Sequence, residues 1–267
     1  MLGSELAGEA KGLRRWVYSA FGTLDVDEKI WCWHYQKYYL PILRSVPSAR
    51  ILDAGCGDGL WSFYLARKFP QHSILGIDIR QDAVDICSRI KKREGLINTQ
   101  FQAMPFTEIA FDREFDVILS FFSLHYSYEI DVDILNRFAK ALKPGGWLLM
   151  TVPVAPILWK SQLKRRGLES GKTNKYGIAI DFGEFKNHYF AEELSEKLNQ
   201  AGFMSQQFHR LVGRLGQYAK SAYTSASRRL FTKIVIWTLA AMLRKIGTFL
   251  PAKNGMVWLT ASRKNDQ

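Results

Sequence analysis

The chain has 267 residues, of which 47% are hydrophobic and 23% charged, and its formal net charge is +12 at pH 7. A chain of this length and composition can bury a substantial core, which excludes a disordered protein and a small disulfide-stabilised one. Its three cysteines show no C-x-x-C spacing and its five histidines form no H-x-x-x-H pair, so neither a disulfide framework nor a metal site is expected.

Residues 1–16 are poor in apolar residues and contain acids, which excludes a standard secretory signal and leads us to expect a cytoplasmic protein. Residues 27–43 are dense in aromatics at helical spacing, and the pattern predicts a helix that ends near Pro41. We therefore expect residues 1–45 to form an N-terminal helical cap.

The segment Ile51–Gly59, with the sequence ILDAGCGDG, predicts a buried strand that runs into a glycine-rich turn. Glycines at alternate positions allow positive φ angles and let the backbone pass close to a ligand. A helix that begins near Leu60 would point its free N–H groups into the same hollow. The turn therefore predicts a nucleotide-type binding site.

The spacing of the glycines indicates which kind of nucleotide is bound. A dinucleotide fingerprint, G-x-G-x-x-G, needs a third glycine at position 60, which is Leu60 in this chain. Asp53 also stands beside the turn, where a carboxylate repels a pyrophosphate but attracts a cationic amino group. A ligand with an amino-acid end fits this turn better than a dinucleotide does.

Strand and helix patterns then alternate along the chain. Such alternation predicts an α/β fold with a mostly parallel sheet and helices on both faces. The expected strands are 50–54, 73–78, 98–103, 114–120 and 146–152, and the expected helices are 59–69, 81–94 and 130–141. A further helix and glycine turn at 190–203 precede a sixth strand at 203–212, and a last strand is expected at 255–262.

Five segments in this order resemble the class I S-adenosylmethionine-dependent methyltransferases, in the branch of the ubiquinone/menaquinone-type and other small-molecule enzymes. They are Ile51–Gly59, Ser73–Asp78, Phe115–Ser120, Leu142–Met150 and Phe190–Phe203. The resemblance implies a seven-stranded Rossmann-like sheet and S-adenosyl-L-methionine as the cofactor. It places the methyltransferase domain at residues 46–267, with insertions at 153–189 and at 213–254, a helical one before the last strand.

The same resemblance implies a set of cofactor contacts. The family pattern gives a residue set for each part of the ligand: Asp53, Gly55, Cys56, Gly57 and Gly59 for the methionine end, Asp78 for the ribose, Ile79, Ala103 and Met104 for the adenine, and Ser120 and Phe121 beside the sulfonium. The family usually carries an acid near the end of the third strand, where this chain has Gln102. The amide oxygen of Gln102 can still accept a hydrogen bond from adenine.

His125 is the candidate catalytic residue. It follows the fourth predicted strand, from which this family commonly addresses its acceptor. A histidine suits proton removal near neutral pH if the acceptor is a hydroxyl or an acidic carbon. A hydrogen-bonded structural histidine is the alternative interpretation.

The positive charge is concentrated near the C-terminus, since residues 201–264 hold eleven Lys and Arg and no Asp or Glu. Within this segment, residues 230–250 are almost wholly apolar apart from a narrow cationic stripe. The uninterrupted apolar run is about half of the ~20 residues that a membrane span needs. We expect residues 228–250 to dock on an anionic membrane surface at the inner membrane face, to form a lid, or to make an oligomer contact.

These features together predict methyl transfer to a hydrophobic or membrane-associated small molecule, such as a lipid, isoprenoid, polyketide or lipid-linked sugar intermediate. Amino-methyltransferases of nucleic acid bases resemble one another in an Asp/Asn-Pro-Pro-Tyr/Phe motif, where this chain has Ser120–Ser123 with the sequence SFFS. A nucleic-acid substrate is therefore disfavoured, although the basic segment keeps an RNA methyltransferase as the alternative, beside a non-catalytic cofactor-binding scaffold. The sequence does not distinguish O-, N- and C-methylation, or indicate the oligomeric state.

Overall fold

A computed structural model of the chain describes residues 37–124, 132–153, 191–211, 242 and 257–265. The chain divides into two compact units, residues 1–42 with 210–255 and residues 43–209 with 256–267. The second unit contains the sheet and the glycine-rich turn. Among the described residues, no helix has the length and apolar character that crossing a membrane requires.

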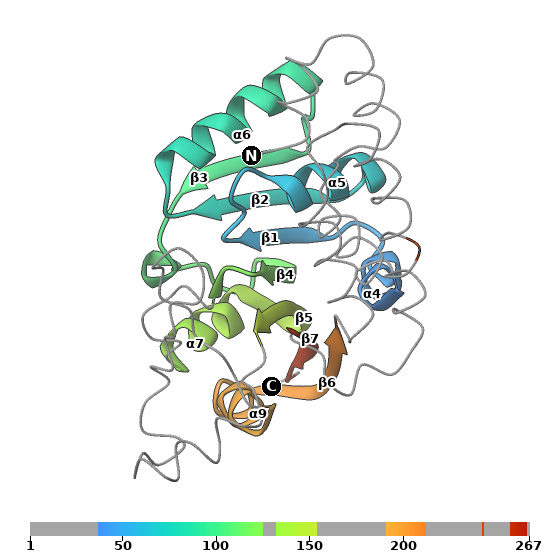
Figure 1. The fold of residues 1–267 in the computed structure, drawn as a ribbon, viewed down its shortest axis with the longest axis vertical. Helices are drawn as coiled ribbons and strands as arrows, with labels where there is room; N and C mark the ends of the chain where they lie inside the picture. The colour runs from blue at the N-terminus through green and yellow to red at the C-terminus, as the bar shows by residue number, and fades with distance from the viewer. Residues whose placement is uncertain (1–36, 125–131, 154–190, 212–241, 243–256, 266–267) are drawn as a thin grey trace, which may run out of the picture. The chain divides into compact units, whose positions relative to one another are not determined.

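The second unit is built on a seven-stranded sheet. Its order is β3-β2-β1-β4-β5-β7-β6 (Figure 1). The strands from β1 to β5 pair in parallel, and β7 pairs antiparallel with β5. Their bounds are β1 Arg50–Ala54, β2 Ser73–Asp78, β3 Thr99–Ala103, β4 Phe115–Phe121, β5 Leu142–Pro153, β6 Phe203–Leu211 and β7 Val257–Lys264. The predicted α/β fold with a mostly parallel seven-stranded sheet is confirmed.

In the described part of the chain, four α-helices follow β1: α5 Leu60–Lys68, α6 Gln81–Glu94, α7 Val132–Ala141 and α9 Ala191–Gln200. The chain moves from β1 outward to β3 through α5 and α6, and from β4 to β5 through α7. Because parallel crossovers are right-handed, these two directions place α5 and α6 on one face of the sheet and α7 on the other (Figure 1). The helix α9 packs beside α7.

The order of the strands reverses between β1 and β4. In open parallel sheets, ligands bind outside the carboxyl ends of the strands at such a switch point. Here the last four residues of β1 are all buried, as expected for a strand that is covered on both faces. The fold therefore directs attention to the loops that follow β1, β2 and β4.

Two predicted boundaries were wrong. The turn Lys143–Gly146 was expected to precede a strand at 146–152, but it lies inside β5 as an irregularity, because Phe115 pairs with Leu142 and Val117 pairs with Trp147. Lys143 anchors it, since its Nζ donates to both carboxylate oxygens of Asp116 at 2.9 Å.

The second difference concerns Pro41. Residues 37 and 38 are helical and Tyr39 lies in a turn, but a new helix, α4 Leu40–Ser45, continues past the proline. A proline is tolerated in the first turn of a helix, where its missing N–H has no intrahelical partner to lose. A short 3-10 helix, η1 Phe106–Glu108, was also not predicted.

Several predictions fall on residues outside the described ranges. They are most of the N-terminal cap at 1–45, the insertions at 153–189 and 213–254, and the amphipathic segment at 228–250. They stay predictions.

His72 holds the chain segment before β1 against the start of β2. Its side chain is 1% exposed, its Nδ1 accepts a hydrogen bond from the N–H of Ala49 at 3.0 Å, and its Nε2 lies 3.2 Å from the carbonyl of Leu43. Because Nδ1 accepts, the proton must be on Nε2, which donates to Leu43. Burial lowers the pKa of His72 below its usual value of 6.5 and outweighs the opposing effects of Leu43 and of the charge on Asp116.

We predict that His72→Leu lowers the free energy of unfolding by about 2–3 kcal/mol at about pH 8, because the N–H of Ala49 and the carbonyl of Leu43 lose a buried partner. Below pH 6.5 the unfolded chain takes up a proton at His72 that the folded chain does not, so the wild-type advantage should shrink as the pH falls. Urea unfolding of both proteins at about pH 8 and about pH 5.5 measures this difference. A gap that widens in acid would contradict the assigned neutral state.

Candidate functional site

The glycine-rich loop follows β1 and is fixed to the end of β2. The N–H groups of Gly55 and Cys56 both donate to the carbonyl of Ile77, at 2.8 and 2.9 Å. Gly55, Gly57 and Gly59 all have positive φ angles, of 79°, 54° and 83°. Positive φ angles, which glycine allows at low steric cost, are therefore present at all three positions.

The three glycines are required for different reasons. A Cβ on Gly55 would lie 2.2 Å from the Cβ of Ser123, and one on Gly59 would lie 2.6 Å from the ring of Phe63. A Cβ on Gly57 would meet no atom within 4 Å. Packing against neighbouring side chains thus explains why Gly55 and Gly59 are glycines. At Gly57, by contrast, the space that a side chain would occupy is open and can be filled by a ligand.

Asp78, the last residue of β2, is held directly beside this loop. Its Oδ2 accepts a hydrogen bond from the N–H of Gly57 at 2.8 Å, and its Oδ1 accepts one from the N–H of Arg80 at 3.0 Å. Each carboxylate oxygen has a second lone pair for another donor. The structure therefore brings the predicted ribose acid next to Gly57, the glycine of this loop that faces open space, with its carboxylate oriented by two backbone groups.

Asp53 lies under the loop, on the α5 side of the sheet. It is 2% exposed, and its Oδ2 accepts a hydrogen bond from the hydroxyl of Ser62 at 2.6 Å. Burial raises the pKa of Asp53 to about 6 from a usual value of 3.8, the hydrogen bonds from Ser62 oppose this rise, and the charge on Asp78 adds to it. Sequence reasoning missed Ser62, although a polar residue in the first turn of the predicted helix was a signal for it.

The predicted adenine contacts meet at the same edge of the sheet. The N–H of Met104 donates to the backbone carbonyl of Asp78 at 2.9 Å, which ties the chain after β3 to the end of β2. Ile79 has 73% of its surface exposed, and Ala103 and Met104 are half-buried. The structure thus gathers Asp78, Ile79, Ala103 and Met104 in one place.

The end of β4 is fastened to the glycine loop from the other side. The hydroxyl of Ser123 donates to the carbonyl of Ala54 at 2.8 Å and lies 3.0 Å from the hydroxyl of Ser120. Phe121 is half-buried, whereas Ser120 is fully buried. Sequence reasoning named Ser120 and Phe121 but missed Ser123, and His125 lies outside the described residues.

Cys56 has a structural environment. Its thiol and that of Cys87 both donate toward the carbonyl of Gly57, at 3.6 and 3.4 Å. The neighbouring thiol of Cys87, together with burial, raises the pKa of the Cys56 thiol. Cys56 therefore stays a neutral thiol that supports the loop from below. Among the described residues, no group of three or more His, Cys, Asp or Glu side chains could hold a metal ion.

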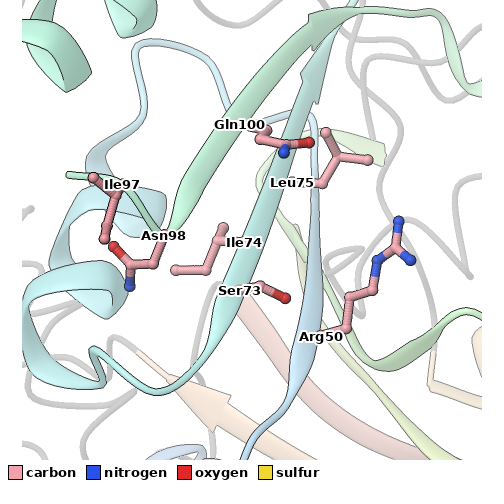
Figure 2. A pocket seen from close by; sticks show the side chains of 7 residues that line it. All are labelled: Arg50, Ser73, Ile74, Leu75, Ile97, Asn98 and Gln100. Carbon is pink, nitrogen blue, oxygen red and sulfur yellow. The ribbon is translucent and has the colours of Figure 1, made fainter.

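A pocket of about 280 Å³ lies elsewhere. Figure 2 shows its lining at the start of β1 and β2 and around the start of β3, so it is at the amino ends of these strands. The Arg50 side chain there pairs with Glu114 at 2.9 Å, and the amide nitrogen of Asn98 donates to the carbonyls of Ala66 and His72. The side chains of Arg50 and Asn98 are thus used within the protein, and the pocket lies at the opposite ends of the strands from the candidate site.

Comparison with known proteins finds matches over the part of the chain that holds the candidate site. The family model described as a methyltransferase domain matches residues 51–146, from β1 into β5. The fatty-acid O-methyltransferase of Mycolicibacterium smegmatis is 35% identical over 108 residues, which are 40% of this chain and 38% of that protein. The phthiotriol/phenolphthiotriol dimycocerosates methyltransferase 1 of Mycobacterium ulcerans is 27% identical over 218 residues, which are 79% of this chain and 78% of that protein.

Ribosomal RNA small subunit methyltransferase C of Acinetobacter baumannii is 33% identical over 114 residues, 41% of this chain and 34% of that protein. This chain therefore spans little more than a third of the length of the fatty-acid and ribosomal RNA enzymes. Among solved structures, a SAM-dependent methyltransferase of Methanosarcina mazei has a TM-score of 0.57 at 21% identity, covering 85% of this chain and 98% of that one. At this identity the similarity shows the fold.

We predict that Asp53→Asn stabilises the ligand-free protein above about pH 6, because the folded wild type must then hold a buried negative charge. Because the pKa of Asp53 is raised by folding, the wild type keeps its full stability below pH 3.8 and loses part of it as the pH rises to about 6. The stability gained by Asp53→Asn should therefore grow over this window and then level off. The size of the pKa shift limits the gain in the free energy of unfolding to about 3 kcal/mol. The gain is smaller than this limit because the buried amide of Asn needs a hydrogen-bond partner of its own.

Thermal and urea unfolding across this pH range measure the effect, and Ser62→Ala is the matched control. This substitution removes the hydrogen bond that stabilises the carboxylate of Asp53 and limits the rise in its pKa, so it should destabilise the protein most above about pH 6. An Asp53→Asn protein that is less stable than wild type in neutral solution would contradict the burial argument.

Proposed function

We propose that this chain, which belongs to the class I S-adenosylmethionine-dependent methyltransferases, transfers a methyl group from S-adenosyl-L-methionine to a hydrophobic or membrane-associated small molecule. The observation that carries the proposal is the pairing of Asp78 with Gly57 at the switch point of the sheet. An oriented carboxylate beside an open backbone turn fits a ligand with vicinal hydroxyls and an amino-acid end.

The fit of the cofactor can be followed along its length. The lone pairs of Asp78 that point away from Gly57 and Arg80 would accept the two ribose hydroxyls. The exposed side chain of Ile79 and the half-buried Met104 would cover the faces of the adenine. The methionine end would lie along Gly57, where a side chain would have open space.

The role of Asp53 follows from its charge. A buried carboxylate with a pKa of about 6 carries an unfavourable negative charge at neutral pH. The ammonium of an amino-acid ligand above it, in direct contact or through a water molecule, would stabilise that charge. Asp53 would thus hold the methionine end of the cofactor. A dinucleotide would instead bring a pyrophosphate close to Asp53, and the two negative charges would repel each other.

The cofactor supplies an electrophilic methyl group on a sulfonium, and the chain has only to bind and align the acceptor with it. Ser120 and Phe121 at the end of β4 would line the region beside the sulfonium. His125 would accept the proton from a hydroxyl or acidic-carbon acceptor.

A hydrophobic acceptor is supported by two kinds of observation. The relatives include enzymes named for a fatty acid and for phthiotriol dimycocerosates. The chain also combines an acid-free basic segment at 201–264 with an apolar run inside it, which suits an anionic lipid surface. The O-, N- or C-methylation of that acceptor is left open.

The second candidate is an RNA methyltransferase. It is favoured by the same basic segment and by the similarity to a ribosomal RNA enzyme. Binding measurements distinguish the two candidates. An RNA enzyme would bind oligonucleotides with an affinity that falls steeply with salt, whereas lipid docking would give vesicle binding that depends both on the anionic lipid content and on Trp237 in the apolar run.

We predict that Asp78→Ala weakens the binding of S-adenosyl-L-methionine by about 1–3 kcal/mol, because it removes the acceptor of the ribose hydroxyls and frees the N–H of Gly57. Isothermal titration calorimetry measures this change. Asp82→Ala is the matched control, since Asp82 is an exposed carboxylate four residues away that faces Arg80 at 3.9 Å. Equal losses in both variants, or none in Asp78→Ala, would remove Asp78 from the site.

We further predict that the protein transfers labelled methyl groups from S-adenosyl-L-methionine to a product in the organic phase when it is given a lipid extract of its host. Mass spectrometry of that product then identifies the acceptor, and a parallel incubation with host RNA tests the second candidate. Label in RNA alone would replace the proposed acceptor. Cofactor that binds but is never consumed in either extract would indicate a non-catalytic scaffold.

A further inference from the structure

Three aromatic rings meet beside the glycine loop, and we call Trp61, Tyr64 and Phe121 the aromatic corner. The ring centroids of Trp61 and Phe121 are 5.5 Å apart with an interplanar angle of 87°. Those of Trp61 and Tyr64 are 5.8 Å apart with an angle of 80°. These near-perpendicular contacts are favourable geometries for aromatic pairs, so the three rings support one another.

The position of the aromatic corner follows from the chain. Trp61 comes two residues after Gly59, in the first turn of α5, and Phe121 is the last residue of β4. Since β1 and β4 are neighbours in the sheet and the strand order reverses between them, the corner stands at the switch point. Ser123, two residues after Phe121, touches Gly55 of the glycine loop.

The backbone that carries Phe121 is held in a strained conformation. Phe122 has a φ of 52°, which is uncommon for a residue other than glycine. Its N–H donates to the hydroxyl of Thr151 at 3.0 Å and to the carbonyl of the same residue at 3.3 Å. Strain of this kind persists only where the surroundings enforce it, and it is often found at functional sites.

The corner also differs from the core in its exposure. The large side chains of the core, such as Phe115 and Phe138, are fully buried, whereas all three rings of the corner are half-buried. Lys68, an exposed residue, lies above the ring of Tyr64. The corner therefore presents apolar surface next to the place where the sulfonium end of the cofactor would lie.

We propose that Trp61 and Phe121 form the wall that binds the hydrocarbon part of the acceptor. This inference rests on the proposed function and narrows it, because the acceptor must then carry an apolar chain close to the atom that is methylated. Trp61 is a specificity-determining residue in this account, and its contribution grows with the apolar area that the acceptor lays against it.

The test uses the full chain saturated with S-adenosylhomocysteine, with dodecanoate and hexanoate as hydrocarbon probes at concentrations where both are monomeric. Calorimetry should show that the wild type binds dodecanoate more tightly than hexanoate. Trp61→Ala should weaken dodecanoate binding by at least about tenfold and leave hexanoate binding almost unchanged, while Trp61→Phe retains most of the preference.

The control is Trp147→Ala. Trp147 is also half-buried on the sheet, but it is level with Val117, toward the other end of β4 from Phe121. Thermal unfolding reports whether each variant is folded, because Phe121 itself lies in the candidate cofactor site. If Trp61→Ala does not fold, Phe121→Leu tests the same wall, with the same expected loss of chain-length preference.

Trp61→Ala or Phe121→Leu that binds both probes as the wild type does would overturn the inference. So would a wild type that ignores dodecanoate and yet labels an organic-phase product from the lipid extract, a result that leaves the proposed function standing. A wild type that labels no organic-phase product at all would refute the proposed function itself.

Discussion

The hydrogen bond from the N–H of Gly57 to the carboxylate of Asp78 is the interaction on which the site depends. It joins the loop after β1 to the end of β2, and the N–H of Met104 extends the connection to the end of β3. On the other side, Ser123 fastens the end of β4 to Ala54 and fills the space beside Gly55. Three strand ends are thereby fixed around one loop before any ligand is bound, which lowers the ordering cost of binding.

Asp53 shows how the site departs from what stability alone would select. A neutral side chain would suit its buried position better, because burial raises the pKa of the carboxyl to about 6. Ser62 compensates part of the cost through its hydrogen bond. Asp53 would therefore destabilise the free protein and gain a counter-charge when the ligand binds, so that ligand binding increases stability. Such trade-offs between stability and activity are common at functional sites.

Much of the fold and part of the site could be predicted from the sequence. Strand periodicity and the spacing of Gly55, Gly57, Gly59 and Asp78 are local patterns, and they placed the loop and its acid correctly side by side. Ser62, Ser123 and Trp61 were missed because their partners are distant in sequence or are fixed only by helix packing. The turn at Lys143 was placed before β5 because its anchor, Asp116, lies on the neighbouring strand.

The central claim is that the loop after β1 and the acid at the end of β2 hold S-adenosyl-L-methionine. Titration of the purified full-length chain with this compound and with S-adenosylhomocysteine in a calorimeter tests it most directly. The account predicts saturable binding of both compounds at a single site, with a dissociation constant in the range of about 1 μM to 1 mM. A folded protein that gives no binding heat and no thermal stabilisation with either compound at concentrations of about 1 mM would contradict it.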